Sequence, residues 1–91
     1  MKRFDSAIGV VELTDERKRH ILQFHPDIKS YWKHFAETLA SPDSVHRSKF
    51  DAEAKIFYRT VSEQKKYLVI VVKTNHRNFI LTAYLTYRIQ H

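Results

Sequence analysis

Two consecutive runs in the last third of the chain decide the fold: Tyr67-Leu-Val-Ile-Val-Val-Lys-Thr74 and Asn78-Phe-Ile-Leu-Thr-Ala-Tyr-Leu-Thr-Tyr87. The first run is almost continuously apolar and β-branched, which is typical of a strand buried at the centre of a sheet. The second run alternates, and this predicts one face toward the core and one polar face. The expected core face carries Phe79, Leu81, Ala83, Leu85 and Tyr87, and the expected polar face carries Ile80, Thr82, Tyr84, Thr86 and Arg88.

The two runs are close enough in sequence to form a hairpin, whose register we predict by placing His76-Arg77 at its tip. Lys73 then opposes Ile80, Val71 opposes Thr82, and Val69 opposes Tyr84. This register places Lys73, Thr82 and Tyr84 together on the polar face, whereas Leu68, Ile70 and Val72 join the core. The polar face is a candidate functional surface. The alternative is an ordinary solvent-facing sheet surface, where Thr and Tyr are common.

Two helices are predicted before these strands. Thr14 is a plausible N-cap, followed by acidic residues that suit the first turn, and this helix runs through Phe24. Pro26 suits the first position of a second helix, which ends at Ser41-Pro42-Asp43. The second helix carries an apolar stripe made of Ile28, Tyr31, Trp32, Phe35 and Leu39.

The remaining segments are predicted as strands at residues 44–50 and 54–61, and residues 8–13 form a short strand or an extended arm. In the strand over 54–61 either Ile56 and Tyr58 or Phe57 and Val61 point inward, so the face of Arg59 stays open. Short connections favour an antiparallel meander. We therefore expect a single α+β domain over residues 1–91, with two N-terminal helices packed on one face of a four-stranded antiparallel sheet.

The composition favours an anionic partner. Sixteen Lys and Arg against ten Asp and Glu give a formal charge of +6 on 91 residues, which favours nucleic acid. The absence of cysteine excludes disulfides and thiolate sites, and it suits a reducing cytoplasm. No apolar run is long enough to span a membrane, so we expect a cytoplasmic protein without membrane association.

Two histidines lie around the end of the first helix. His20 and His25 are five residues apart and diverge on a helix, so they do not predict a metal site. His25 instead precedes Pro26 at the start of the second helix, where backbone N–H groups attract phosphate and an imidazole can transfer a proton. The alternative is an ordinary capping histidine. Basic clusters that either form solvated strand ends or border a phosphate site are Lys65-Lys66, His46-Arg47 and His76-Arg77-Asn78.

The order of these motifs resembles the phage-type nucleases of the barnase–EndoU–colicin–RelE (BECR) superfamily. The resemblance extends from about Val10 to the C-terminus, and its most recognisable pieces are His25-Pro26-Asp27 and Thr82-Ala-Tyr84. The other matching segments are His20, Tyr31, Leu39, Pro42-Asp43, Tyr58-Arg59 and Tyr67–Lys73.

The resemblance implies a metal-independent endoribonuclease, often a toxin or phage effector, that needs no cofactor. RNA would be its substrate, and an acidic antitoxin or immunity protein a possible partner. His20 or His25 would transfer protons during attack by the 2′-OH, and Arg59 and Lys73 would stabilise the phosphate charge. Thr82 and Tyr84 would bind the phosphate or position the nucleotide. The alternative is a non-catalytic RNA- or protein-binding module on the same RelE-like fold.

Overall fold

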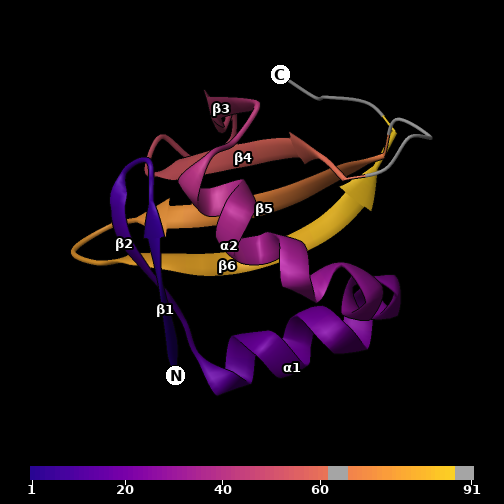
Figure 1. Cartoon of the computed structure of the whole chain (residues 1–91). Helices are drawn as coiled ribbons and strands as arrows, with labels where there is room; N and C mark the ends of the chain where they lie inside the picture. The colour runs from indigo at the N-terminus through magenta and orange to yellow at the C-terminus, as the bar shows by residue number, and fades with distance from the viewer. Residues whose placement is uncertain (62–65, 88–91) are drawn as a thin grey trace.

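The computed structural model describes residues 1–61 and 66–87, in which three helical segments cover one face of a six-stranded sheet (Figure 1). The strand order is β1-β2-β6-β5-β4-β3. The strands are β1 (Lys2–Ser6), β2 (Gly9–Leu13), β3 (Ser44–Arg47), β4 (Ala54–Thr60), β5 (Tyr67–Thr74) and β6 (Asn78–Thr86). The helical segments are α1 (Asp15–Phe24), the 3₁₀ helix η1 (Pro26–His34) and α2 (Phe35–Ala40).

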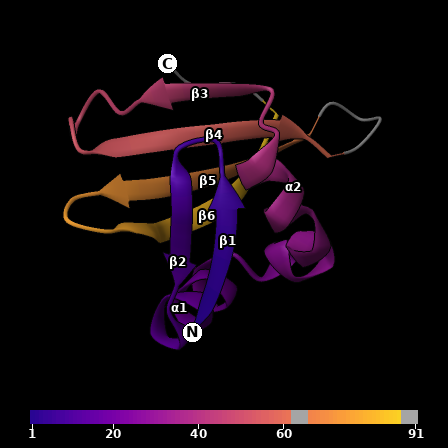
Figure 2. The ribbon, with the colours of Figure 1, turned by 60° about the vertical axis from the view of Figure 1, so that its left-hand side comes forward.

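The expectation of a four-stranded antiparallel sheet is wrong, although the α+β class and the antiparallel meander from β3 to β6 agree with the structure. The N-terminal segment forms a β1–β2 hairpin, and β2 then pairs parallel to β6 at Glu12 and Phe79. The sheet is therefore six-stranded and mixed. Figure 2 shows β1 and β2 running steeply across the direction of the other strands, which fits the short pairing of β2 with β6.

The core lies between the helices and one face of the sheet. Thr14 caps α1 as predicted, because its side chain accepts a hydrogen bond from the Arg17 N–H at 3.1 Å. The predicted second helix instead winds as η1 and continues as α2. Four fully buried apolar side chains from these segments belong to the core, namely Ile21, Ile28, Phe35 and Leu39.

A β-bulge in the last hairpin corrects the predicted register. Val69 opposes Tyr84 and Val71 opposes Thr82 as expected, but the register shifts between Val71 and Val72. Lys73 consequently opposes Phe79 instead of Ile80, and Thr74 opposes Asn78. An extra residue in one strand reverses the alternation beyond it. The fully buried residue of this stretch is therefore Ile80, in place of the expected Phe79 and Leu81.

The pairing of β4 with β5 settles which residues of β4 face the helices. Phe57 opposes Ile70 in the core, and Arg59 opposes Leu68, so both lie on the helical side of the sheet. Tyr58 lies on the other side, opposite Val69, and is only 1% exposed. The face away from the helices is therefore apolar and buried at its centre, with polar residues around it.

Among the described residues, no helix is long and apolar enough to cross a membrane.

Candidate functional site

One of the candidate histidines contacts one of the candidate polar residues of the sheet: His25 lies against Tyr84. Their ring centroids lie 5.9 Å apart, with the ring planes tilted by 38°. His25 comes from the junction of α1 and η1, and Tyr84 comes from the second half of β6. We call this pair of side chains the His25–Tyr84 site.

The backbone around His25 fixes where its imidazole lies. The His25 N–H donates to the Ile21 carbonyl at 2.7 Å, and the His25 carbonyl accepts from the Ile28 N–H at 3.0 Å. His25 thus ends one helix and begins the next, with no side-chain hydrogen bond capping η1. Pro26 occupies the first turn of η1, where its fixed φ suits the helix and its missing N–H would have no partner within the helix. The imidazole is held beside β6 by both helices.

Tyr84 is partly buried, and this changes its acidity. Burial raises the pKa of the Tyr84 phenol above its ordinary value of 10.0, and the neighbouring Tyr58 raises that pKa further. Both effects disfavour the phenolate. Tyr84 therefore keeps its proton at neutral pH and can donate a hydrogen bond. Thr82 lies two residues earlier on the same sheet face, opposite Val71, and is partly exposed.

Lys73 shares this sheet face, but its charge is already paired. Its ammonium donates a hydrogen bond to the Asp51 carboxylate and lies 3.9 Å from the Glu53 carboxylate. This hydrogen bond, donated by Lys73 to Asp51, raises the pKa of Lys73 and lowers the pKa of Asp51. Asp51 and Glu53 lie just before β4, and no sequence motif indicates that they pair with Lys73. The sequence analysis therefore did not identify them.

Arg59 lies apart from the His25–Tyr84 site, on the helical side of the sheet. Its guanidinium donates to the Ser41 carbonyl and to the Glu37 carboxylate, and it lies 3.9 Å from Asp43. Asp43 also accepts a hydrogen bond from the Thr60 N–H at 2.7 Å. These contacts join the end of α2 to β4, so the visible role of Arg59 is structural.

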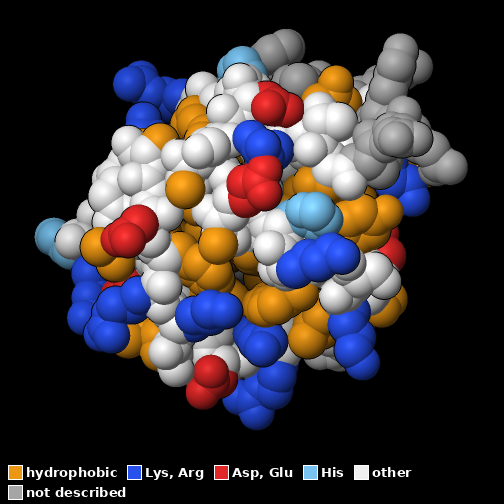
Figure 3. Space-filling view, in the orientation of Figure 1, with side chains coloured by type: hydrophobic (Ala, Val, Ile, Leu, Met, Phe, Trp, Pro, Cys, Tyr) orange, Lys and Arg blue, Asp and Glu red, His pale blue; other side chains and the backbone are white. Residues whose placement is uncertain are grey.

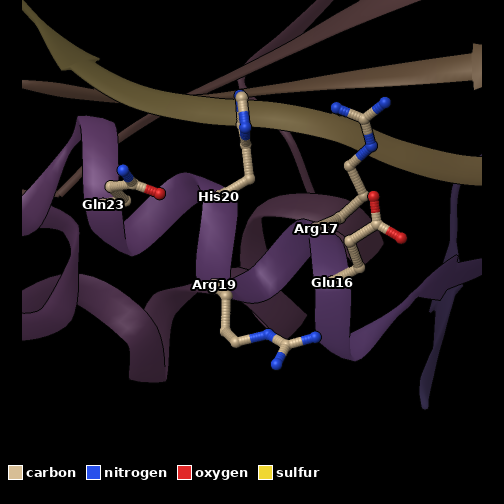
Figure 4. A pocket seen from close by; sticks show the side chains of 5 residues that line it. All are labelled: Glu16, Arg17, Arg19, His20 and Gln23. Atoms are coloured by element: carbon tan, nitrogen blue, oxygen red, sulfur yellow. The ribbon is translucent and has the colours of Figure 1, made fainter.

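His20 lies on the exposed face of α1, and its ring contacts Phe24 with centroids 4.7 Å apart. Figure 4 shows that it lines a surface pocket with Glu16, Arg17, Arg19 and Gln23, all from the same helix. His20 and Arg17 project to the side where the neighbouring β6 lies, whereas Arg19 points away. The structure thus brings His25 and Tyr84 together, but it places His20, Arg59 and Lys73 in separate contacts.

Lys and Arg side chains gather over α1 and η1, with hydrophobic side chains between them (Figure 3). We call this the basic surface, and its cations are Arg17, Lys18, Arg19, Lys29 and Lys33. One of them, Lys18, lies 4.9 Å from the centre of the Trp32 ring. The α1 and η1 segments also carry the carboxylates Asp15, Glu16 and Asp27, so this surface has a net charge of +2 (five cations minus three carboxylates).

Comparison of the chain with protein-family models, with curated proteins and with solved structures gives no match in any of the three.

Proposed function

We propose that this protein is a metal-independent endoribonuclease whose catalytic centre is the His25–Tyr84 site. The observation that carries the proposal is the 5.9 Å contact between an imidazole and a partly buried phenol from two distant parts of the chain. The order of sequence motifs that resembles the BECR nucleases supports it independently, because it includes both residues.

The proposed reaction needs a base, an acid and a positive charge. His25 takes the proton from the 2′-OH of the substrate, and that oxygen attacks the adjacent phosphorus. The bond from phosphorus to the 5′-oxygen breaks, and Tyr84 gives its proton to the leaving 5′-oxygen. The products are a 2′,3′-cyclic phosphate and a 5′-OH end. Thr82 is suited to hydrogen-bond a phosphate oxygen, because it lies on the same strand and face as Tyr84.

We assign to the cations of the basic surface the stabilisation of the negative charge that develops on the phosphate. Arg59 and Lys73 are less suited to this role, since both already bind carboxylates. Fixed cations near a phosphate stabilise the charge that forms in the transition state.

The test is cleavage of end-labelled RNA in excess EDTA by the wild type and by His25→Ala, Tyr84→Phe and Thr82→Ala. We expect His25→Ala and Tyr84→Phe to lose roughly 100-fold or more in rate, as removal of a general base or acid does. Thr82→Ala should lose less. His76→Ala is the matched control, because His76 is exposed at the β5–β6 turn and should cleave normally.

The products and the variants together decide the proposal. Wild-type products must end in a 2′,3′-cyclic phosphate, and a substrate with 2′-O-methyl groups throughout must stay intact. Loss of activity in His20→Ala but not in His25→Ala would move the base to His20. Intact RNA with every folded protein would contradict the endoribonuclease.

A non-catalytic RNA-binding module is the second candidate, favoured by the pairing of Arg59 and Lys73 with carboxylates. It predicts binding without cleavage, with an affinity that falls steeply as salt increases.

A further inference from the structure

Another tyrosine lies on the same sheet face as Tyr84, on the strand beyond β5. Val69 of β5 opposes Tyr84 on one side and Tyr58 on the other, so the two tyrosines flank Val69 directly. Val69 is fully buried and Tyr58 is 1% exposed, although neither belongs to the core cluster beneath the helices. Aromatic side chains can reach across neighbouring strands, and the two tyrosine rings are therefore suited to cover Val69.

Histidine rings lie at both ends of this arrangement. His46 of the edge strand β3 contacts Tyr58 with ring centroids 5.4 Å apart and planes at 71°, an edge-to-face geometry that aromatic rings favour. At the other end, His25 lies 5.9 Å from Tyr84. We call His46, Tyr58, Tyr84 and His25 the ring row. It crosses the sheet from β3 to the junction of α1 and η1.

Electrostatics agrees with the strand register in placing Tyr58 close to Tyr84. Burial is the main cause of the raised pKa of the Tyr84 phenol, and the charge of Tyr58 is the second. Such a charge effect weakens with distance, so it acts between phenols that are near each other. Tyr58 is itself almost completely buried, and close packing restricts a buried ring to few positions.

We propose that Tyr58 is a positioning residue that holds the Tyr84 ring against His25. Its ring limits the movement of the Tyr84 side chain from the β4 side, and His25 limits that movement from the other side. The effect on cleavage rests on the proposed function, because misplacing a catalytic group by about 1 Å can cost roughly 100-fold in rate. The packing of Tyr58 on Tyr84 does not depend on catalysis.

NMR of the wild-type protein tests the packing without any substitution. We expect a nuclear Overhauser effect between the ring protons of Tyr58 and those of Tyr84, with Tyr58→Phe and Tyr84→Phe used to assign the two rings. Its absence from the spectrum of the folded protein would overturn the proposal. The chemical shift of the His25 Hε1 proton then reports where the Tyr84 ring lies, because the ring current of Tyr84 acts on it. Tyr84→Leu gives the shift without that ring.

Substitutions of Tyr58 use this shift as their measure. Tyr58→Leu should move the His25 Hε1 resonance toward its position in Tyr84→Leu, and Tyr58→Phe should leave it unchanged because the ring remains. Phe57→Leu is the matched control, since Phe57 is equally buried on the same strand but faces the helices. It should destabilise the protein without moving the resonance. An unmoved resonance in Tyr58→Leu, or an equal movement in Phe57→Leu, would overturn the proposal.

RNA cleavage separates the positioning role from the proposed function. Tyr58→Leu should lose about 10-fold or more in kcat with an unchanged KM, and Tyr58→Phe should cleave like the wild type. Normal cleavage by Tyr58→Leu would overturn the positioning role. A wild type that cleaves no RNA would contradict the endoribonuclease, and the Overhauser effect and the His25 resonance would then decide the proposal. The Overhauser effect also decides it if Tyr58→Leu does not fold.

Discussion

Lys73 illustrates how neighbouring charges decide what a polar residue does. Sequence alternation predicts its sheet face correctly, but its ammonium is bound by Asp51 and faces Glu53 at 3.9 Å. Asp51 is itself fixed, because its carboxylate accepts a hydrogen bond from the Glu53 N–H at 2.9 Å. The cluster fastens the β3–β4 connection to β5.

The Asp51–Lys73 pair predicts a loss of stability in acid. The hydrogen bond from Lys73 holds the pKa of Asp51 below its ordinary 3.8, so the folded state favours the carboxylate. Its contribution is complete above 3.8 and disappears as the pH falls through the lowered pKa. Because the pKa of Lys73 is raised above 10.5, its contribution to stability is complete below 10.5 and is lost as the pH rises through the raised value.

Urea unfolding of Asp51→Asn across the pH range checks this prediction. The variant should be slightly less stable than the wild type from neutral pH down to about pH 5, and the difference should shrink below that. Glu53→Gln is the matched control and should have a smaller effect, because its carboxylate is farther from Lys73. A difference that stays constant down to the acid transition would contradict the assignment.

At the scale of elements, Arg59 connects α2 to β4. Its guanidinium satisfies the Ser41 carbonyl at the C-terminal cap of α2, and it pairs with Glu37 in the same helix. A cation at a helix C-terminus also interacts favourably with the helix dipole.

Arg59→Ala should therefore destabilise the protein by about 1 kcal/mol, a value reduced for the partial exposure of the side chain. Arg47→Ala provides a matched control on the neighbouring strand. Arg47 directly opposes Lys55, another cation, so its removal should be neutral or slightly stabilising. Chemical denaturation measures both variants. Equal stability of Arg59→Ala and the wild type would show that the Ser41 and Glu37 contacts contribute nothing.

The β1–β2 hairpin depends on one backbone conformation. Gly9 has φ of +107°, which side chains of L-residues rarely adopt, and Ser6 supports the turn by donating to the Gly9 carbonyl at 2.6 Å. An added Cβ would meet only Asn78 Nδ2 at 3.7 Å, so the cost of a substitution lies in the backbone.

Gly9→Ala should consequently lower the free energy of unfolding by about 1–2 kcal/mol. Gly9→Asn should lose less, because Asn tolerates positive φ better than Ala. Thermal unfolding compares the two variants. Equal losses would indicate that crowding, rather than backbone strain, sets the cost.

Across the whole molecule, short-range sequence signals predicted most helices and strands. Long-range strand pairing determined the strand order and the register, which those signals did not predict. The Thr14 cap, the turn at His25-Pro26 and the apolar run of β5 are local features, and the structure agrees with them. The strand β1 was missed because Lys2–Ser6 is short and charged, with Phe4 as its only buried residue. The bulge in β6 was missed because pairing to β5, rather than composition, sets the phase of the alternation.

Local sequence patterns identified residues of the candidate site but could not show which of them are in contact. His25 and Tyr84 were both selected from sequence, but their contact depends on how the α1–η1 junction docks beside β6. The ion pairs of Arg59 and Lys73 involve acidic residues distant in sequence, which no local pattern connects. Ion pairing between distant segments therefore limited the prediction of the candidate site, whereas the missed N-terminal hairpin limited the prediction of the fold.

The parallel pairing of β2 with β6 has a consequence for how the protein is made. The ribosome releases the N-terminal hairpin first, but the strand beside which it must lie is synthesised last of the six. Until then Val11 and Leu13, both fully buried in the native fold, lack the β6 strand beside which β2 lies. Tyr84 is on that same late strand, so its contact with His25 forms only after β6 has been synthesised.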